Sequence, residues 1–138
     1  MVVLDSRGRG AANRKGSRMK FAGIYGITAG ILILIQWLFF LLTAQVPELE
    51  SAPLEIVFHL AAEFMASVVM IVAGTAVLQR KPWAARVYYL ASGMFIYTVI
   101  NSAGYFMQLG QWLLVLMFAL LLFLSVVSIG KVVRTAKA

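Results

Sequence analysis

Long apolar runs alternate with short polar breaks along the chain. A helix needs about 20 apolar residues to cross the ~30 Å hydrocarbon core of a bilayer, and four runs meet this requirement. They cover approximately residues 21–44, 54–78, 83–107 and 112–130. Proline, glycine and glutamine occupy the breaks and favour turns and helix ends. Because the breaks are short, neighbouring helices must be antiparallel. The pattern predicts an all-α fold, an integral membrane four-helix bundle with up-down-up-down topology.

The composition supports a membrane protein. Of the 138 residues, 62% are hydrophobic and 12% are charged, and the mean hydropathy is +0.92, far from the values of soluble domains. The chain has no cysteine, which excludes disulfides, iron–sulfur clusters, zinc–thiolate sites and thiol nucleophiles.

Positive charges sit at alternate breaks. Six Lys or Arg residues precede the first run, three lie in or beside the second break, and three follow the fourth run. The first and third breaks have none, and the first instead carries Glu48 and Glu50, with Glu55 just beyond. Because Lys and Arg are retained on the cytoplasmic side, both termini are expected in the cytoplasm of a multi-pass protein of the cell membrane.

The two ends of the chain are predicted to be basic cytoplasmic tails. Residues 1–20 lack apolar periodicity and are expected to be disordered, and residues 131–138 form the C-terminal tail. The lipid bilayer is the expected partner of these charges, and no nucleic acid is expected. The first apolar run exceeds the ~7–15 residues of a signal peptide and is therefore interpreted as a span.

One face of the second span is polar. Glu55, His59 and Glu63 recur every four residues and share a helical face. Glu63 lies about 10 Å into the outer leaflet by the helical rise, where a charged side chain costs ~2.5–3.5 kcal/mol. A carboxyl group at that depth must be protonated or have a donor beside it, and His59 is the expected donor.

Two other spans present polar groups at a similar depth. Gly26 and Gly30 on the first span allow close helix contact. We therefore expect the first three helices to converge on one polar cluster in the outer half. Besides Glu63 and His59, the candidates for ligand binding or proton handling are Gln36, Tyr97, Asn101 and Tyr105.

Several functions fit this pattern. The first hypothesis is a pocket that binds a small lipid-like or quinone-like ligand, or a partner subunit. A second is a non-catalytic scaffold or accessory subunit, homo-oligomeric or in a larger membrane complex, that docks through the apolar fourth span. A third is proton-coupled transport through Glu63 and His59. The polar cluster can also serve packing alone.

Cofactor and enzyme signals are sparse. Glu55, His59 and Glu63 offer one nitrogen and two carboxylates for a metal ion. The single histidine excludes bis-histidine haem ligation within one subunit. The sequence contains no arrangement of nucleophile and base and no cofactor motif, so no cofactor is indicated and an enzyme is not the favoured interpretation.

The second and third spans also resemble a known family. The resemblance rests on Glu63-Phe64, the apolar run to Gly74, Leu78, the basic turn Arg80-Lys81-Pro82-Trp83-Ala84, and Gly93. In these features the chain resembles the middle of the DoxX-like group of small four-span membrane proteins. The resemblance implies four spans and an accessory role beside a membrane oxidoreductase. The charged positions expected in that family's first span have no counterpart here, so it implies no catalytic residues.

Overall fold

The computed structural model describes residues 3–136, with side chains from residue 8 onward. This part of the chain forms five helices and no strand: α1 (Val3–Leu42), α2 (Glu48–Ser51), α3 (Pro53–Leu78), α4 (Ala84–Gln108) and α5 (Trp112–Ala136). The predicted all-α class is confirmed. The ends of the four long helices lie within two residues of the boundaries expected for the apolar runs, except for the start of α1 and the end of α5, which extend further. The one-turn helix α2 was not anticipated.

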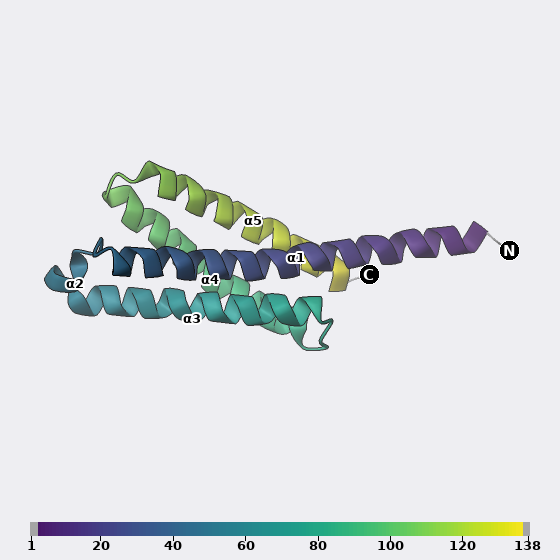
Figure 1. Ribbon diagram of the computed structural model, residues 1–138. Coiled ribbons are helices and arrows are strands. Elements are labelled where there is room, and N and C mark those ends of the chain that lie inside the picture. Colours follow the sequence, from purple (N-terminus) through teal and green to yellow (C-terminus); the bar gives the residue numbers. More distant parts are fainter. Residues whose placement is uncertain (1–2, 137–138) are drawn as a thin grey trace.

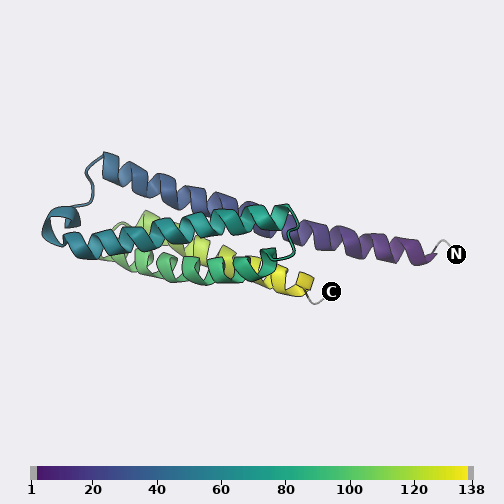
Figure 2. The ribbon, with the colours of Figure 1, turned by 90° about the horizontal axis from the view of Figure 1, so that it is seen from below.

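The four long helices pack as a ring. α1 contacts α3 and α5, and α4 contacts the same two helices from the other side, with the most extensive interface between α1 and α3. Figures 1 and 2 show successive long helices running in opposite directions. One end of the ring carries α2 and the α4–α5 turn, and we call it the acidic end. The other, the basic end, carries the α3–α4 turn and the last turns of α5, and α1 extends past it (Figure 1).

The N-terminal segment differs from its prediction. Instead of being disordered from residue 1 to 20, the chain is helical from Val3 and continues without a break into the first apolar run. Figure 2 shows this part of α1 extending beyond the other helices. Once the apolar part of a helix has formed, each added residue gains a hydrogen bond without the cost of nucleation. Residues 131–136 likewise continue α5, and residues 1–2 and 137–138 lie outside the described residues.

In each turn between long helices the second residue after the helix has a left-handed backbone conformation. Ala44, Arg80 and Gly110 have φ values of 52°, 54° and 69°. At each turn the amide N–H of the next residue donates to a carbonyl of the last helical turn, as Lys81 does to Ala76 over 3.0 Å. This is the Schellman ending, in which glycine is usual because other side chains strain the backbone.

Glycines bring α1 and α3 into backbone contact, as the Gly26 and Gly30 spacing predicted. A Cβ atom added at Gly30 would lie 2.7 Å from the backbone oxygen of Ser67. One added at Gly74 would lie 2.7 Å from the backbone oxygen of Gly23 and 2.9 Å from the backbone nitrogen of Ile27. Atoms cannot approach so closely without a shift of backbone, so α1 and α3 can pack this tightly only with glycine at these positions.

We predict that Gly74→Ala destabilises the protein by about 1–3 kcal/mol, because the added methyl group must push α1 and α3 apart. Gly93→Ala is the matched control, since nothing lies within 4 Å of a Cβ atom at Gly93. The measurement is unfolding of the detergent-solubilised protein by a denaturing detergent, followed by far-ultraviolet circular dichroism. Equal stability of the two variants would contradict the close α1–α3 contact.

Candidate functional site

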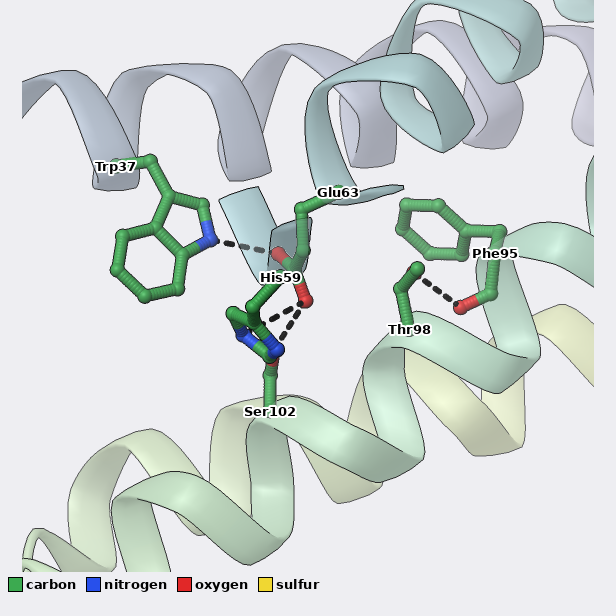
Figure 3. Close-up of polar contacts among 6 residues, drawn as sticks. All are labelled: Trp37, His59, Glu63, Phe95, Thr98 and Ser102. Carbon is green, nitrogen blue, oxygen red and sulfur yellow. Dashed lines mark hydrogen bonds and ion pairs between the residues drawn. The ribbon is translucent and has the colours of Figure 1, made fainter. Parts of the chain in front are cut away.

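Glu63 is a buried carboxyl group shared by three helices. It projects from α3 and is only 1% exposed. The indole Nε1–H of Trp37, on α1, donates to Glu63 Oε2 over 2.6 Å, and the hydroxyl of Ser102, on α4, donates to Glu63 Oε1. Figure 3 shows the indole nitrogen and the serine side chain converging on the carboxyl group. Each oxygen thus has a donor, which a buried carboxyl group requires if it is not to destabilise the fold.

The helical period explains why these three residues meet. Buried positions on α3 recur at Ile56, Leu60, Glu63 and Ser67, so the carboxyl group lies on the face that packs into the ring. The buried face of α4 likewise includes Ser102, between Val99 and Phe106. On α1, Trp37 falls on the same side as Gly30, two turns earlier, and therefore also faces α3.

His59 lies between the buried carboxyl group and the surface. Its side chain is 20% exposed, and Nε2 lies 3.9 Å from Glu63 Oε1 and 3.5 Å from Ser102 Oγ. The imidazole ring packs edge-on against Trp37 and is tilted against Tyr105, with ring centroids 5.6 Å and 5.9 Å apart. His59 is therefore the polar side chain through which Glu63 adjoins the surface.

A polar pocket opens on the surface side of His59. It has a volume of about 460 Å³ and lies between α2, the first turns of α3 and the last turns of α4. Its polar lining residues are Glu48, Glu55, His59, Asn101, Tyr105 and Gln108. None of the described residues lining it is lysine or arginine. The Tyr105 hydroxyl donates to Glu48 Oε2 over 2.8 Å and so ties α2 to α4 across one wall.

The structure brings together most of the predicted site residues. Glu63 and His59 are adjacent, as expected, and His59, Asn101 and Tyr105 line the pocket. Tyr97 does not join them, because it is 66% exposed and lies outside the pocket. The expected rotation of α4 was wrong for this residue: small hydroxyl residues of α4 face the interior, while Tyr97 and Asn101 lie on its exposed side.

Gln36 does not reach the cluster either. Its two amide atoms are buried, and neither has a hydrogen-bond partner among the described residues. Trp37, the next residue along α1, instead makes the contact with Glu63 that was expected of Gln36. Sequence reasoning missed Trp37 and Ser102, although the spacing of Gly30, Ile33 and Trp37 would have identified the side of α1 that meets α3.

The hypothetical metal set does not assemble. Among the described residues no group of three His, Asp or Glu side chains is placed to hold a metal ion. Glu55 is exposed at the pocket wall, whereas both oxygens of Glu63 accept hydrogen bonds from protein donors. The Glu55 carboxyl group therefore faces the pocket, whereas the Glu63 carboxyl group is bound within the protein interior.

A second buried polar group lies toward the basic end. The Tyr25 hydroxyl donates to the Leu121 carbonyl over 2.7 Å and lies 2.6 Å from Ser125 Oγ. The Tyr88 hydroxyl donates to the Ala22 carbonyl over 2.9 Å and also bonds to Ser128. These contacts join α1, α4 and α5. The sequence analysis did not identify them, since it treated α5 as an apolar wall.

The described residues thus define an all-helical protein in which three helices, Gly8–Leu42, Pro53–Leu78 and Trp112–Ala136, are long and apolar enough to cross a membrane. The helix α4 is of similar length but more polar and is not among them. The chain belongs to the family described as a domain of unknown function, DUF8058, whose model matches residues 17–138. Comparison with curated proteins and with solved structures finds no significant match.

We predict that Trp37→Phe lowers the stability of the protein by about 1–3 kcal/mol, because Glu63 Oε2 loses its donor while it stays buried. Trp112→Phe is the matched control, since Trp112 is exposed at the start of α5. In the double variant Trp37→Phe/Glu63→Leu the penalty should be smaller than the sum of the single ones. Additive penalties, measured by unfolding in detergent, would show that the two side chains are not coupled.

Proposed function

We propose that the chain is a four-span membrane protein, an up-down-up-down helical bundle with both termini in the cytoplasm, whose pocket at the acidic end binds a small ligand. The topology is supported first by charge. The described Lys and Arg side chains lie on residues of the basic end, and Glu48, Glu50 and Glu55 lie at the acidic end. Since cytoplasmic ends carry the Lys and Arg excess, the basic end is assigned to the cytoplasm.

The fourth crossing is assigned to α4. At 25 residues it is about 37 Å long, enough to cross a hydrocarbon core. It packs between α3 and α5, two helices that are apolar enough to span. Several of its polar side chains, including Ser92 and Ser102, are buried within the protein and would not contact lipid. The single charged residue of α4, Arg86, lies in its first turn at the basic end.

Labelling of single cysteines tests the four-span topology, because the chain has no cysteine of its own. We expect a membrane-impermeant maleimide to label Ser51→Cys and Gln111→Cys in intact cells, and to label Gln79→Cys only after the membrane is permeabilised. All three positions are exposed. If α4 did not cross, residues 79 and 111 would be labelled from the same side, and the proposal of four spans would be wrong.

The observation that carries the ligand proposal is the pocket of about 460 Å³ with Glu63 buried behind His59. Ligand sites are concave, with a few convergent polar groups. Two carboxylates and no cation line this pocket, which favours a ligand with a positive charge or several hydrogen-bond donors. A quinone-like or lipid-like ligand would instead present oxygen atoms to the donors of His59, Asn101 and Gln108.

Proton handling is a second candidate, favoured by the position of His59. Its ring lines the pocket on one side and lies 3.9 Å from Glu63 on the other. A proton taken up or released by a bound ligand would therefore have an imidazole and then a carboxyl group within reach. This candidate requires that Glu63→Gln remove the pH dependence of ligand binding. The accessory role implied by the DoxX-like resemblance is compatible with both candidates.

A scaffold role has weaker support. The face of α5 with Leu113, Leu116 and Leu120 is exposed, but lipid covers such a face equally well. A partner subunit at that face remains the alternative if the pocket binds nothing.

Native mass spectrometry of the protein in lipid nanodiscs, with elemental analysis, tests the ligand proposal. We expect a small molecule retained by the wild type to be bound about tenfold or more weakly by Glu55→Gln, since hydrogen bonds to a charged group contribute about 1.5–3 kcal/mol. Glu50→Gln is the matched control, because Glu50 is exposed and does not line the pocket. An empty wild-type protein, or equal retention by both variants, would contradict the proposal.

A further inference from the structure

At the basic end a second pocket lies where α1 passes the α3–α4 turn. It has a volume of about 400 Å³. Lys15 on α1 and Arg80 and Lys81 on the turn supply its charged lining. An adjoining pocket of about 450 Å³ shares Arg80 and adds Lys20. The continuous helix that replaces the expected disordered tail places Lys15 beside a turn 65 positions later in the sequence.

Among the described side chains, the positive charge of this pocket has no acidic counterpart nearby. None of its lining residues is Asp or Glu. The described acidic side chains are on Glu48, Glu50, Glu55 and Glu63, in α2 and the first half of α3, and thus all at or toward the acidic end. Three cations around one pocket without a carboxylate attract an anion, and most strongly one with several oxygen acceptors.

Apart from Thr135, the remainder of the lining has no polar side chain, and it includes Met19, Pro82 and Ala85. A free phosphate ion would leave this part of the pocket without a suitable contact. A phospholipid fits both parts, because its phosphate group can reach the cations while the first carbons of its acyl chains contact the apolar wall. Trp83, exposed next to the pocket, is a residue typical of the headgroup level of a bilayer.

The backbone at Arg80 provides an independent observation. Arg80 has the left-handed conformation, φ 54°, held by the hydrogen bonds from Arg80 N–H to the Val77 carbonyl and from Lys81 N–H to the Ala76 carbonyl. At the corresponding position after α4 the chain has Gly110. Glycine would relieve the backbone strain at residue 80. The arginine therefore makes the turn less stable than glycine would.

We propose that the pocket formed by Lys15, Arg80 and Lys81 is a binding site for the phosphate headgroup of an anionic phospholipid in the cytoplasmic leaflet. The proposal rests on the four-span topology but not on the ligand pocket at the acidic end. Lys15 supplies charge from α1 and Lys81 from the α3–α4 turn, and Arg80 presents its planar guanidinium group to phosphate oxygens. An occupied site would also fix the N-terminal part of α1 against the turn.

The test is native mass spectrometry of the purified full-length chain in detergent, titrated separately with phosphatidylglycerol, phosphatidylcholine and inorganic phosphate. We expect one phosphatidylglycerol per chain to be retained at concentrations at which phosphatidylcholine is not. Arg80→Gly should bind this lipid about fivefold more weakly, the effect of roughly one cation at a lipid surface. The same variant should unfold no more easily than the wild type, because glycine relaxes the turn.

A matched pair of double variants separates a site from diffuse attraction. Lys15→Gln/Lys81→Gln removes two charges from the pocket, and Arg86→Gln/Arg134→Gln removes two from the same end at residues that do not line it. Only the first pair should weaken lipid retention, by about 25-fold if the two effects add. Equal weakening by both pairs, or no preference for phosphatidylglycerol, would overturn the site.

Two further outcomes are distinguishable. Complete displacement of the lipid by inorganic phosphate would show that the pocket selects the phosphate group alone, which would overturn the assignment to a phospholipid. Labelling of Gln79→Cys from outside intact cells would place the turn on the other side of the membrane, and would thus refute the topology even if the pocket binds lipid in detergent.

Discussion

The backbone contact between α1 and α3 determines where the buried polar groups lie. Gly30 meets the backbone of Ser67, and Gly74 meets that of Gly23. From this contact, Trp37 lies seven residues further along α1, about 10 Å, and Glu63 lies one turn back along the antiparallel α3. One turn is about 6 Å, so the two backbone positions differ in level by about 4 Å. Side chains lean toward the N-terminus of their own helix, which in an antiparallel pair moves the indole and the carboxyl group toward each other, and the 2.6 Å hydrogen bond forms. Bulkier residues at the contact would separate the helices and leave Glu63 Oε2 without the Trp37 donor.

The sequence predicted the helices well because length and hydrophobicity decide them. The breaks predicted at residues 79–82 and 108–111 agree to within one residue with the turns at residues 79–83 and 109–111. Glu63 and His59 were identified because polar groups within an apolar run are costly and stand out. The rotation of α4 was less predictable. Serine is small enough to be buried beside a carboxyl group, whereas the polar tyrosine and asparagine side chains that guided the prediction lie on the exposed side of α4. Periodicity could not decide between these two faces.

Opposite charges at the two ends give the molecule two chemically distinct surfaces. The acidic end holds a polar pocket with two carboxylates, and the basic end holds pockets lined by Lys and Arg. In a membrane this asymmetry orients the chain and attracts anionic lipid on one side only. In the proposed topology the same charges would serve both insertion and lipid contact. The pocket at the acidic end has no lining Lys or Arg, so its charge is of the opposite sign.

The interior between the two ends bears on the choice between ligand binding and conduction. Near the acidic end, the hydrogen bonds of Glu63 reach Trp37 and Ser102, with His59 beside them. Near the basic end, Tyr25 and Tyr88 bond to serines of α5 and to backbone carbonyls. Among the described residues no hydrogen bond links these two groups, and the buried hydroxyls of Ser67 and Ser92 have no partner. Within the described part of the chain, His59, on the pocket side, is therefore the only titratable side chain close enough to exchange a proton with Glu63. This arrangement favours proton exchange coupled to ligand binding over a continuous proton path across the protein.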